Sequence, residues 1–367
     1  DVVALVRAQL PGVRTLAIGD GANDVGMITQ AHVGVGISGV EGLQASRAAD
    51  YAIGEFRHLQ RLLFVHGRES YRRNSVLILY NFWKNVVLVL PQLWYAVLFS
   101  NYSGVTLYDN YLYQLVNLVY TSLPIILFAV WDVEIDAAAL MANPVYYKVS
   151  LQRQQFNIHT FLMWFGTGVT QSLCIALLAA FADFDPNSSG GFLGLWGYGL
   201  IVFSMTQITA TIKIYIFSNS FYAFNVLASL LSLGLFFLSL YAIDQLEFHI
   251  RYGLVGAVFA SPAFYVAAAL VLVCCSFLDH VWHMVQKILF YKSINIINRY
   301  EMLDSAEKEV FEVELEKRIS LVRARSAQGL TDLPMVALHP SVQDLMVEIN
   351  KSYKFAPDTQ SRPASKN

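Results

Sequence analysis

Two carboxylates and one amide lie within five residues of each other near the start of the chain. Asp20, Asn23 and Asp24 belong to the run Gly-Asp-Gly-Ala-Asn-Asp over residues 19–24. Carboxylate oxygens are hard ligands that suit Mg²⁺, an ion that keeps several waters and pairs with phosphate. The alternative is a tight turn from a strand into a helix, with an Asp that caps the helix. The full run, with the amide beside both carboxylates, favours the magnesium and phosphate site.

Two further pairs of polar residues lie inside apolar stretches. Lys84 and Asn85 lie about two turns into one stretch, and Asn117 and Thr121 are one helical turn apart in the next. An ionisable group at the centre of a membrane helix costs roughly 2.5–3.5 kcal/mol, which points to a function. Pro124 follows the second pair and exposes a backbone carbonyl, and polar groups beside a broken helix often line a path through a membrane. Two alternatives remain open: Lys84 can snorkel to the membrane surface, and Asn117 with Thr121 can join neighbouring helices.

The first 58 residues must position Asp20, and their pattern alternates between helix and strand. An apolar, β-branched run leads into the motif, as a buried parallel strand requires. These strands are too few to bury a complete doubly wound sheet, so we expect further strands from a preceding part of the protein. The predicted helices are 1–9, 25–31 and 42–48, and the predicted strands are 15–18, 32–37 and 51–53.

The rest of the chain has the composition of a membrane protein. Of 367 residues, 56% are hydrophobic and only 14% are charged, with a mean hydropathy of +0.46. The net charge of −2 gives no indication of a nucleic-acid partner. Six apolar runs are each long enough to cross roughly 30 Å of hydrocarbon. The predicted spans are 76–99, 111–131, 157–182, 196–217, 221–243 and 254–279.

Basic residues set the expected orientation of these spans. Residues 59–75 hold several arginines and are predicted to form a basic stalk at the cytoplasmic membrane boundary, because Arg and Lys mark that side; a solvated helix face is the alternative. Six spans then return the chain to the same side, so both chain ends are expected in the cytoplasm. We expect a cytoplasmic helical tail over 280–327 and a disordered tail over 328–367, which is rich in Pro and polar residues.

Several motifs resemble those of a known family. The run 19–24 resembles the hinge motif that closes the phosphorylation domain of P-type ATPases. Residues 34–45, 49–53 and 65–68 (Val-His-Gly-Arg) resemble the type IV branch, the phospholipid flippases, and the similarity extends to about residue 279. The resemblance implies a multi-pass α-helical membrane protein with six transmembrane helices, preceded by the C-terminal part of a HAD-like α/β phosphorylation domain that comprises residues 1–58.

The resemblance also implies roles for the polar residues. Asp20 and Asp24 would hold Mg²⁺ beside an aspartyl phosphate, and Asn23 and Asp24 would orient the same site. Lys84 and Asn85 would lie beside the path of the lipid headgroup, together with Asn117 and Thr121. The chain contains no Asp-Lys-Thr-Gly-Thr run, and the ATP-binding domain is expected in another part of the protein. We therefore expect the C-terminal part of a longer pump, which cannot complete an ATPase cycle alone.

The expected function is an ATP-driven phospholipid flippase that moves lipid from the exoplasmic to the cytoplasmic leaflet through an aspartyl-phosphate cycle. The resemblance implies a two-span glycosylated accessory β-subunit and a location in the plasma membrane or in Golgi and endosomal membranes. One alternative is a non-catalytic membrane scaffold that binds the accessory subunit. Another is a cation-pumping P-type ATPase, which is disfavoured because residues 111–131 contain no Asp or Glu.

Overall fold

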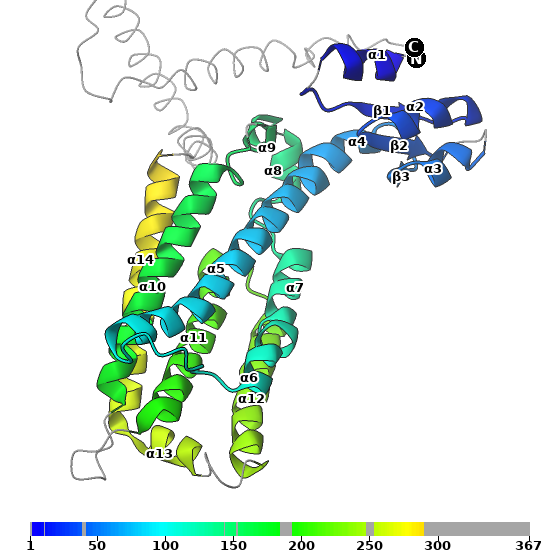
Figure 1. Ribbon diagram of the computed structural model, residues 1–367. Coiled ribbons are helices and arrows are strands. Elements are labelled where there is room, and N and C mark those ends of the chain that lie inside the picture. The colour runs from blue at the N-terminus through cyan, green and yellow to red at the C-terminus, as the bar shows by residue number, and fades with distance from the viewer. Residues whose placement is uncertain are drawn as a thin grey trace, which may run out of the picture. The chain divides into compact units, whose positions relative to one another are not determined.

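A computed structural model describes most of the chain up to residue 289 (Figure 1). The chain divides into two units, residues 1–276 and 277–367, and the second is described only over residues 277–289. Most of the predicted cytoplasmic tail and all of the predicted disordered segment lie outside the described residues. The described ranges are 2–10, 12–38, 42–142, 144–151, 153–183, 193–246 and 253–289.

The first part of the chain forms a small parallel sheet. The strands lie in the order β1-β2-β3, with Ile18 beside Val35 and Gly36 beside Ala52. This confirms the predicted alternation of helices and strands, whereas membership of a larger HAD-like domain stays a prediction. In chain order the elements are α1 (Val2–Gln9), β1 (Leu16–Gly19), α2 (Val25–Gln30), β2 (Val33–Ile37), α3 (Gln44–Ala48) and β3 (Tyr51–Ile53).

The predicted stalk and first span form one uninterrupted helical segment. It comprises α4 (His58–Arg61), the π-helical turn η2 (Leu62–Gly67) and α5 (Arg68–Leu98). Two arginines of the stalk, Arg68 and Arg72, are buried, with exposed fractions of 1% and 3%. A solvated helix face therefore does not describe this part of the stalk, and buried guanidinium groups require buried partners.

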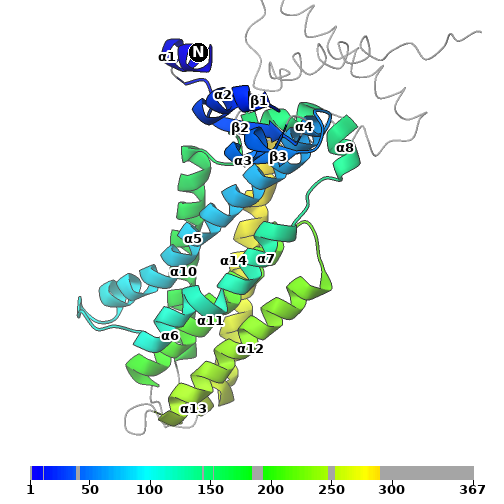
Figure 2. The same ribbon diagram turned by 90° about the vertical axis from the view of Figure 1, so that its right-hand side faces the viewer.

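The second span is broken in its middle. It consists of α6 (Asn110–Leu115), the π-helical turn η3 (Val116–Tyr120) and α7 (Ser122–Trp131). Asp109 starts α6 by accepting hydrogen bonds from the backbone of its first turn. Pro124 lies in the first turn of α7, where a missing N–H is tolerated. In Figure 2, α7 lies between α5 and α12, and it contacts both helices.

The sixth span differs from its prediction. The apolar run predicted as one span over 254–279 is two helices, α13 (Leu254–Ala260) and α14 (Pro262–Leu289). They are separated at Ser261, because Pro262 fits the first position of a helix but not its interior. The remaining elements are α8 (Ala137–Ala142), the 3₁₀ turn η4 (Pro144–Tyr147), α9 (Lys148–Leu151), α10 (Ile158–Ala182), α11 (Gly194–Phe217) and α12 (Ala223–Leu246).

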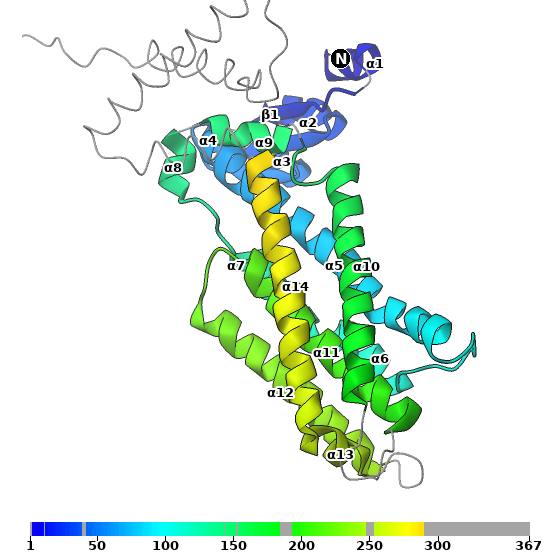
Figure 3. The ribbon, with the colours of Figure 1, turned by 90° about the vertical axis from the view of Figure 1, so that its left-hand side faces the viewer.

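Six segments of the described chain are long and apolar enough to cross a membrane. The most apolar window of α11 is 67% buried, against 28–39% for the other five, so α11 is the most enclosed helix of the bundle. Figure 3 shows α10 beside the first half of α14, and Gln171 of α10 donates a hydrogen bond to the Cys275 carbonyl there (3.0 Å). Of the polar residues that the sequence placed in the spans, these helices enclose Lys84 and Thr121.

Candidate functional site

The Asp20 motif forms a closed turn at the carboxyl end of β1. Asp24 Oδ2 accepts hydrogen bonds from the backbone N–H groups of Asp20 (3.1 Å) and Gly21 (3.3 Å). The turn is so tight that a Cβ on Gly19 would lie 2.3 Å from the Cβ of Asp24, so only glycine fits there. One oxygen of Asp24 thus closes the turn, while the side chains of Asp20 and Asn23 are exposed.

This arrangement fits a magnesium ion only as part of a larger ligand set. In the described residues, no group of three His, Cys, Asp or Glu side chains is placed to hold a metal ion. Asp20 offers an exposed carboxylate, and Mg²⁺ commonly takes one or two carboxylates and fills its remaining positions with water and phosphate. The turn therefore has chemistry that suits Mg²⁺ at a phosphate, and Asp24 Oδ2 holds it closed. The roles of Asp20 and Asp24 as ligands stay predictions.

The structure brings Lys84 and Thr121 together. Lys84 Nζ donates a hydrogen bond to Thr121 Oγ1 (2.9 Å), and Thr121 Oγ1 donates to the carbonyl of Val116 (2.7 Å). Both side chains are buried, at 4% and 1% exposed. The contact joins the first span to the break in the second, and it disfavours a Lys84 that snorkels to the membrane surface.

The two asparagines of the predicted path do not take part in the Lys84–Thr121 contact. Asn85 and Asn117 are both exposed, although each is near Lys84 or Thr121 in the sequence. Successive residues of a helix point about 100° apart, so Asn85 leaves the face that Lys84 uses. The predicted set therefore divides into a buried pair and two exposed amides.

The carbonyl that Pro124 frees is used between helices. Pro124 has no N–H for the carbonyl of Tyr120, four residues earlier. That carbonyl accepts hydrogen bonds from Gln207 Nε2 of α11 (3.1 Å) and Ser232 Oγ of α12 (2.5 Å). The sequence predicted an exposed carbonyl here. In the structure the carbonyl is instead bonded, because side chains of two neighbouring helices donate to it. Gln207 and Ser232 were not predicted, although a Gln inside an apolar run was a signal for such a contact.

A second buried cation lies against Trp83, the residue before Lys84, and was also not predicted. Lys213 of α11 is 1% exposed, and its Nζ lies 4.1 Å from the ring centroid of Trp83 and 4.8 Å from that of Trp164. Aromatic faces attract a cation, and more strongly when water is excluded. Trp83 in turn donates from Nε1 to Gln171 Oε1 (2.7 Å). These contacts fix the rotation of α5 at the residue immediately before Lys84.

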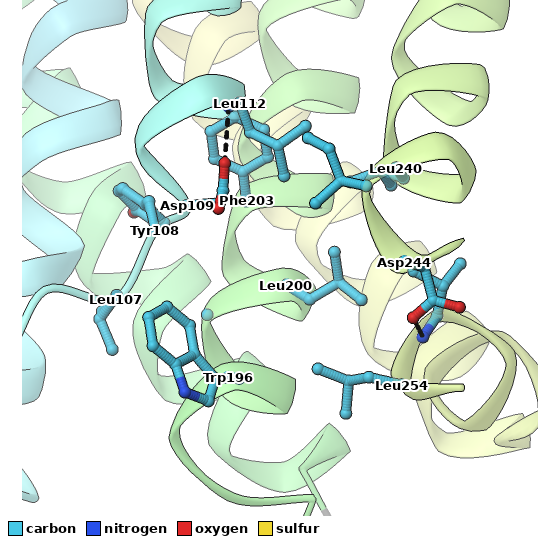
Figure 4. A pocket seen from close by; sticks show the side chains of 13 residues that line it. Leu107, Tyr108, Asp109, Leu112, Trp196, Leu200, Phe203, Leu240, Asp244 and Leu254 are labelled. Carbon is cyan, nitrogen blue, oxygen red and sulfur yellow. Dashed lines mark hydrogen bonds between the residues drawn. The ribbon is translucent and has the colours of Figure 1, made fainter. Parts of the chain in front are cut away.

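One cavity among the described residues lies elsewhere and is small. It has a volume of about 40 Å³ and lies between α6, α11, α12 and α13, with mostly apolar side chains around it (Figure 4). Two carboxylates flank it, and both cap helices: Asp109 Oδ1 accepts from Tyr111 N and Leu112 N, and Asp244 accepts from Gly253 N and Val255 N. A cavity of this size holds a few waters rather than a lipid headgroup.

Comparisons with known proteins agree on one family. Residues 46–292 match the family model described as the C-terminal part of phospholipid-translocating P-type ATPases. The chain is 33% identical over 340 residues to phospholipid-transporting ATPase C887.12 of Schizosaccharomyces pombe, which covers 89% of this chain and 27% of that protein. It is 32% identical over 331 residues to phospholipid-transporting ATPase DRS2 of Saccharomyces cerevisiae, which covers 88% of this chain and 24% of that protein.

A human relative gives the same result over a shorter region. The chain is 38% identical over 216 residues to phospholipid-transporting ATPase IH of Homo sapiens, which covers 58% of this chain and 19% of that protein. The chain thus spans about a quarter or less of the length of these relatives. Lys84 and Thr121 lie inside the region that matches the family model, and the Asp20 motif precedes it.

Proposed function

This chain belongs to the family of phospholipid-translocating P-type ATPases, and on that premise we propose that it forms part of an ATP-driven flippase. The complete pump would move a phospholipid from the exoplasmic to the cytoplasmic leaflet through an aspartyl-phosphate cycle. This chain would contribute the end of the phosphorylation domain and six membrane helices. It has no Asp-Lys-Thr-Gly-Thr run, so we propose that the phosphorylated Asp and the ATP-binding domain lie outside it and that this part is not catalytic alone.

The Asp20 turn would serve the phosphoryl site. Mg²⁺, when bound, neutralises phosphate charge, and phosphoryl transfer depends mainly on such neutralisation and on positioning. The carboxylate of Asp20 and the amide of Asn23 are exposed, so Asp20 would bind the ion and Asn23 would help to orient the same site. Asp24 holds the backbone of Asp20 and Gly21 in place through its Oδ2. The position of the ligand thus depends on the turn as well as on the ligand itself.

The Lys84–Thr121 hydrogen bond is the observation that carries the proposal for the membrane part. It places a cation at the break in the second span, where an anionic phosphodiester headgroup would find a complementary charge. Asn85 and Asn117, on the exposed surfaces of the same two segments, would offer neutral hydrogen-bonding groups along the route. A metal-ion pump is the weaker alternative, because a buried lysine at this break would repel a cation and residues 110–131 supply no carboxylate.

We also propose the setting of the pump. Both chain ends would face the cytoplasm, in the plasma membrane or in Golgi and endosomal membranes, and a two-span glycosylated β-subunit would bind the exoplasmic side. The short connection at residues 99–109, which carries no Lys or Arg, would form part of that exoplasmic surface.

The test is lipid transport by the full-length protein with Lys84→Ala. We expect lipid uptake to fall by about tenfold or more, because a buried charged hydrogen bond of about 1.5–3 kcal/mol is lost at the path. Leu93→Ala is the matched control, since Leu93 lies on the same helix and is 50% exposed. Lipid uptake equal to that of the unmodified pump would remove Lys84 from the path. ATP hydrolysis stimulated by a metal cation and not by lipid would favour the cation pump.

A further inference from the structure

Charged side chains form a cluster where α5 begins and α7 ends, and all of them except Glu134 are buried. Arg72 Nη1 lies 2.8 Å from Asp132 Oδ2, and Arg72 also donates to Glu69 Oε2 from Nε (3.1 Å) and Nη2 (2.9 Å). Arg68 contacts Glu69 and reaches Glu134 Oε2 with its Nη2 (2.7 Å). Asp132 is fully buried. We call these five residues the Arg72–Asp132 cluster.

The cluster holds the end of α7 by its backbone as well as by its charges. Arg72 Nη2 donates to the carbonyl of Asp132 (3.0 Å). The neighbouring Arg73 donates to the carbonyls of Ala129 (3.4 Å) and Val130 in the last turn of α7. Cations are favourable at the carboxyl end of a helix, where carbonyl groups have no partner within the helix. Two successive arginines of α5 therefore fix the position of this helix end.

Asp132 extends the connection to two more helices. Its Oδ1 accepts hydrogen bonds from Ser218 Oγ (2.9 Å), Asn219 N (2.8 Å) and Ser220 N (3.0 Å). These residues connect the end of α11 to the start of α12. One carboxylate thus joins α5 through one oxygen and the α11–α12 connection through the other. The segments that meet here are far apart in the sequence, so their relative position depends on this side chain.

Stability alone is a poor explanation for this cluster. Removing charges from water is costly, and well-packed hydrophobic residues of similar volume often stabilise a protein as well as a buried ion pair does. What a hydrophobic contact lacks is a fixed geometry, whereas Arg72 combines an ion pair to the Asp132 carboxylate with a directional hydrogen bond to the Asp132 carbonyl. The cluster therefore points to a need for a defined position between α5 and α7.

The Lys84–Thr121 contact attaches the same two segments at a second point. Arg72 and Lys84 are 12 residues apart on α5, which is about 18 Å along the helix. Asp132 and Thr121 are 11 residues apart at the two ends of α7, about 16 Å by the same rise. The two contacts run in antiparallel order and at nearly equal spacing. Helix α7 is therefore attached to α5 at both of its ends.

We propose that the Arg72–Asp132 ion pair is a positioning contact of transport, which makes α7 and the α11–α12 connection follow α5 during the cycle. The proposal rests on the function proposed above. With both contacts in place, a displacement of the stalk moves Lys84 and Thr121 together. Without the Arg72–Asp132 pair, only the contacts to backbone carbonyls hold the end of α7 on α5. Helix α7 then follows α5 less closely, so Lys84 and Thr121 separate more often and fewer lipids are moved per ATP hydrolysed.

The test measures ATP hydrolysis and lipid transfer separately in the full-length pump, reconstituted into phospholipid vesicles. Asp132→Asn keeps the shape and an acceptor oxygen for Ser218 and Ser220 but removes the charge that Arg72 binds. We expect the number of lipids moved per ATP hydrolysed to fall at least about fivefold, the lower end of typical coupling between sites. We expect the lipid-to-ATP ratio of Arg72→Lys to lie between those of Asp132→Asn and the unmodified pump. Lysine keeps the positive charge but lacks the several fixed N–H donors of the guanidinium group.

Arg61→Gln is the matched control, because Arg61 belongs to the same helical segment but is exposed. An unchanged ratio of lipid to ATP in Asp132→Asn would overturn the proposal, as would an equal fall in Arg61→Gln. If Asp132→Asn does not fold, Arg72→Lys tests the proposal in its place. The number of lipids that this variant moves per ATP hydrolysed must then fall about twofold or more. Failure of the unmodified pump to move any phospholipid would instead overturn the proposed function, so the two failures are distinguishable.

Discussion

Burial changes the acid–base chemistry of Asp183, which lies outside the apolar helices. It follows α10 directly, its Oδ1 is buried, and no donor in the described part of the chain reaches that oxygen. Burial raises the pKa of this carboxyl from 3.8 to about 7. An unfolded chain ionises near pH 4 while the folded protein stays protonated, so folding loses stability as the pH rises from about 4 to about 7 and changes little beyond.

We expect Asp183→Asn to remove this dependence. The variant should have a higher melting temperature than the unmodified protein at pH 8, and the difference should shrink towards pH 5. The measurement is the melting temperature of the purified protein in detergent across this pH range. Asp136→Asn, at an exposed carboxylate, is the control. A difference that is constant over the whole range would mean that Asp183 is not the titrating group.

Residue types in an apolar run predicted the Lys84–Thr121 site but not its surroundings. Lys84 was identified because a cation inside a span is costly, and Thr121 because it lies beside Pro124. Lys213 carries the same cost and was missed, because its apolar run ends only four residues later, near a predicted membrane surface. The burial of Arg72 was missed because its partner Asp132 lies 60 residues away. Such pairings depend on the rotation of each helix, which the pattern of one segment does not define.

At the scale of an element, the break between α6 and α7 is stabilised by two independent donors, Gln207 and Ser232. Either donor alone can satisfy the Tyr120 carbonyl, whereas a carbonyl without any partner in a membrane costs several kcal/mol. We expect Gln207→Leu and Ser232→Ala to destabilise the protein by about 0.6–1.7 kcal/mol each. The double variant should lose clearly more than the sum, because only then is the carbonyl unpaired.

Melting temperatures of the full-length pump in detergent provide the measurement for this double-mutant cycle. Ser229→Ala is the control, because Ser229 lies on the same helix and donates within it, to the carbonyl of Asn225 (3.1 Å). Additive losses for Gln207→Leu and Ser232→Ala would show that the Tyr120 carbonyl is satisfied in another way.

The elements themselves were largely predictable, with one informative exception. Apolar length identified six spans, and the glycine turn and alternation identified the strands. The sixth run was assigned to one helix because its composition is apolar on both sides of Ser261 and Pro262. Pro262 was the available signal, but a proline alone does not decide the outcome: Pro91 lies inside α5 without ending it, whereas Pro262 begins a new helix.

At the scale of the whole molecule, the order of the spans predicts which connections share a side of the membrane. Residues near Leu151 lie between Lys148 and Arg153, whereas the connection around Val105 has no Lys or Arg. Both side chains are exposed, at 66% and 48%. The excess of basic residues predicts that Leu151 lies on the cytoplasmic side and Val105 on the exoplasmic side.

Cysteine labelling in sealed vesicles checks this arrangement. The native cysteines are first replaced by alanine, and then Leu151→Cys or Val105→Cys is introduced. A membrane-impermeant maleimide should label each site from one side only, and from opposite sides for the two variants. Labelling of both from the same side would rule out the proposed topology. The native cysteines are Cys174, Cys274 and Cys275.

Two helical segments of the bundle contain a turn that is wider than a regular α-helical turn. η2 (Leu62–Gly67) lies between α4 and α5, and η3 (Val116–Tyr120) lies between α6 and Thr121. A π-helical turn has the effect of one inserted residue, and one residue corresponds to about 100° of rotation in a helix with 3.6 residues per turn. The helix faces before and after each turn are therefore rotated relative to those of a regular α-helix. Deleting one residue within η2 would turn the face of α4 by more than a right angle against Arg72 and Lys84, while it shortened the chain by only about 1.5 Å. The orientation of α4 relative to the membrane helix α5 thus depends on a rotational setting, which a change in length alone would not reveal.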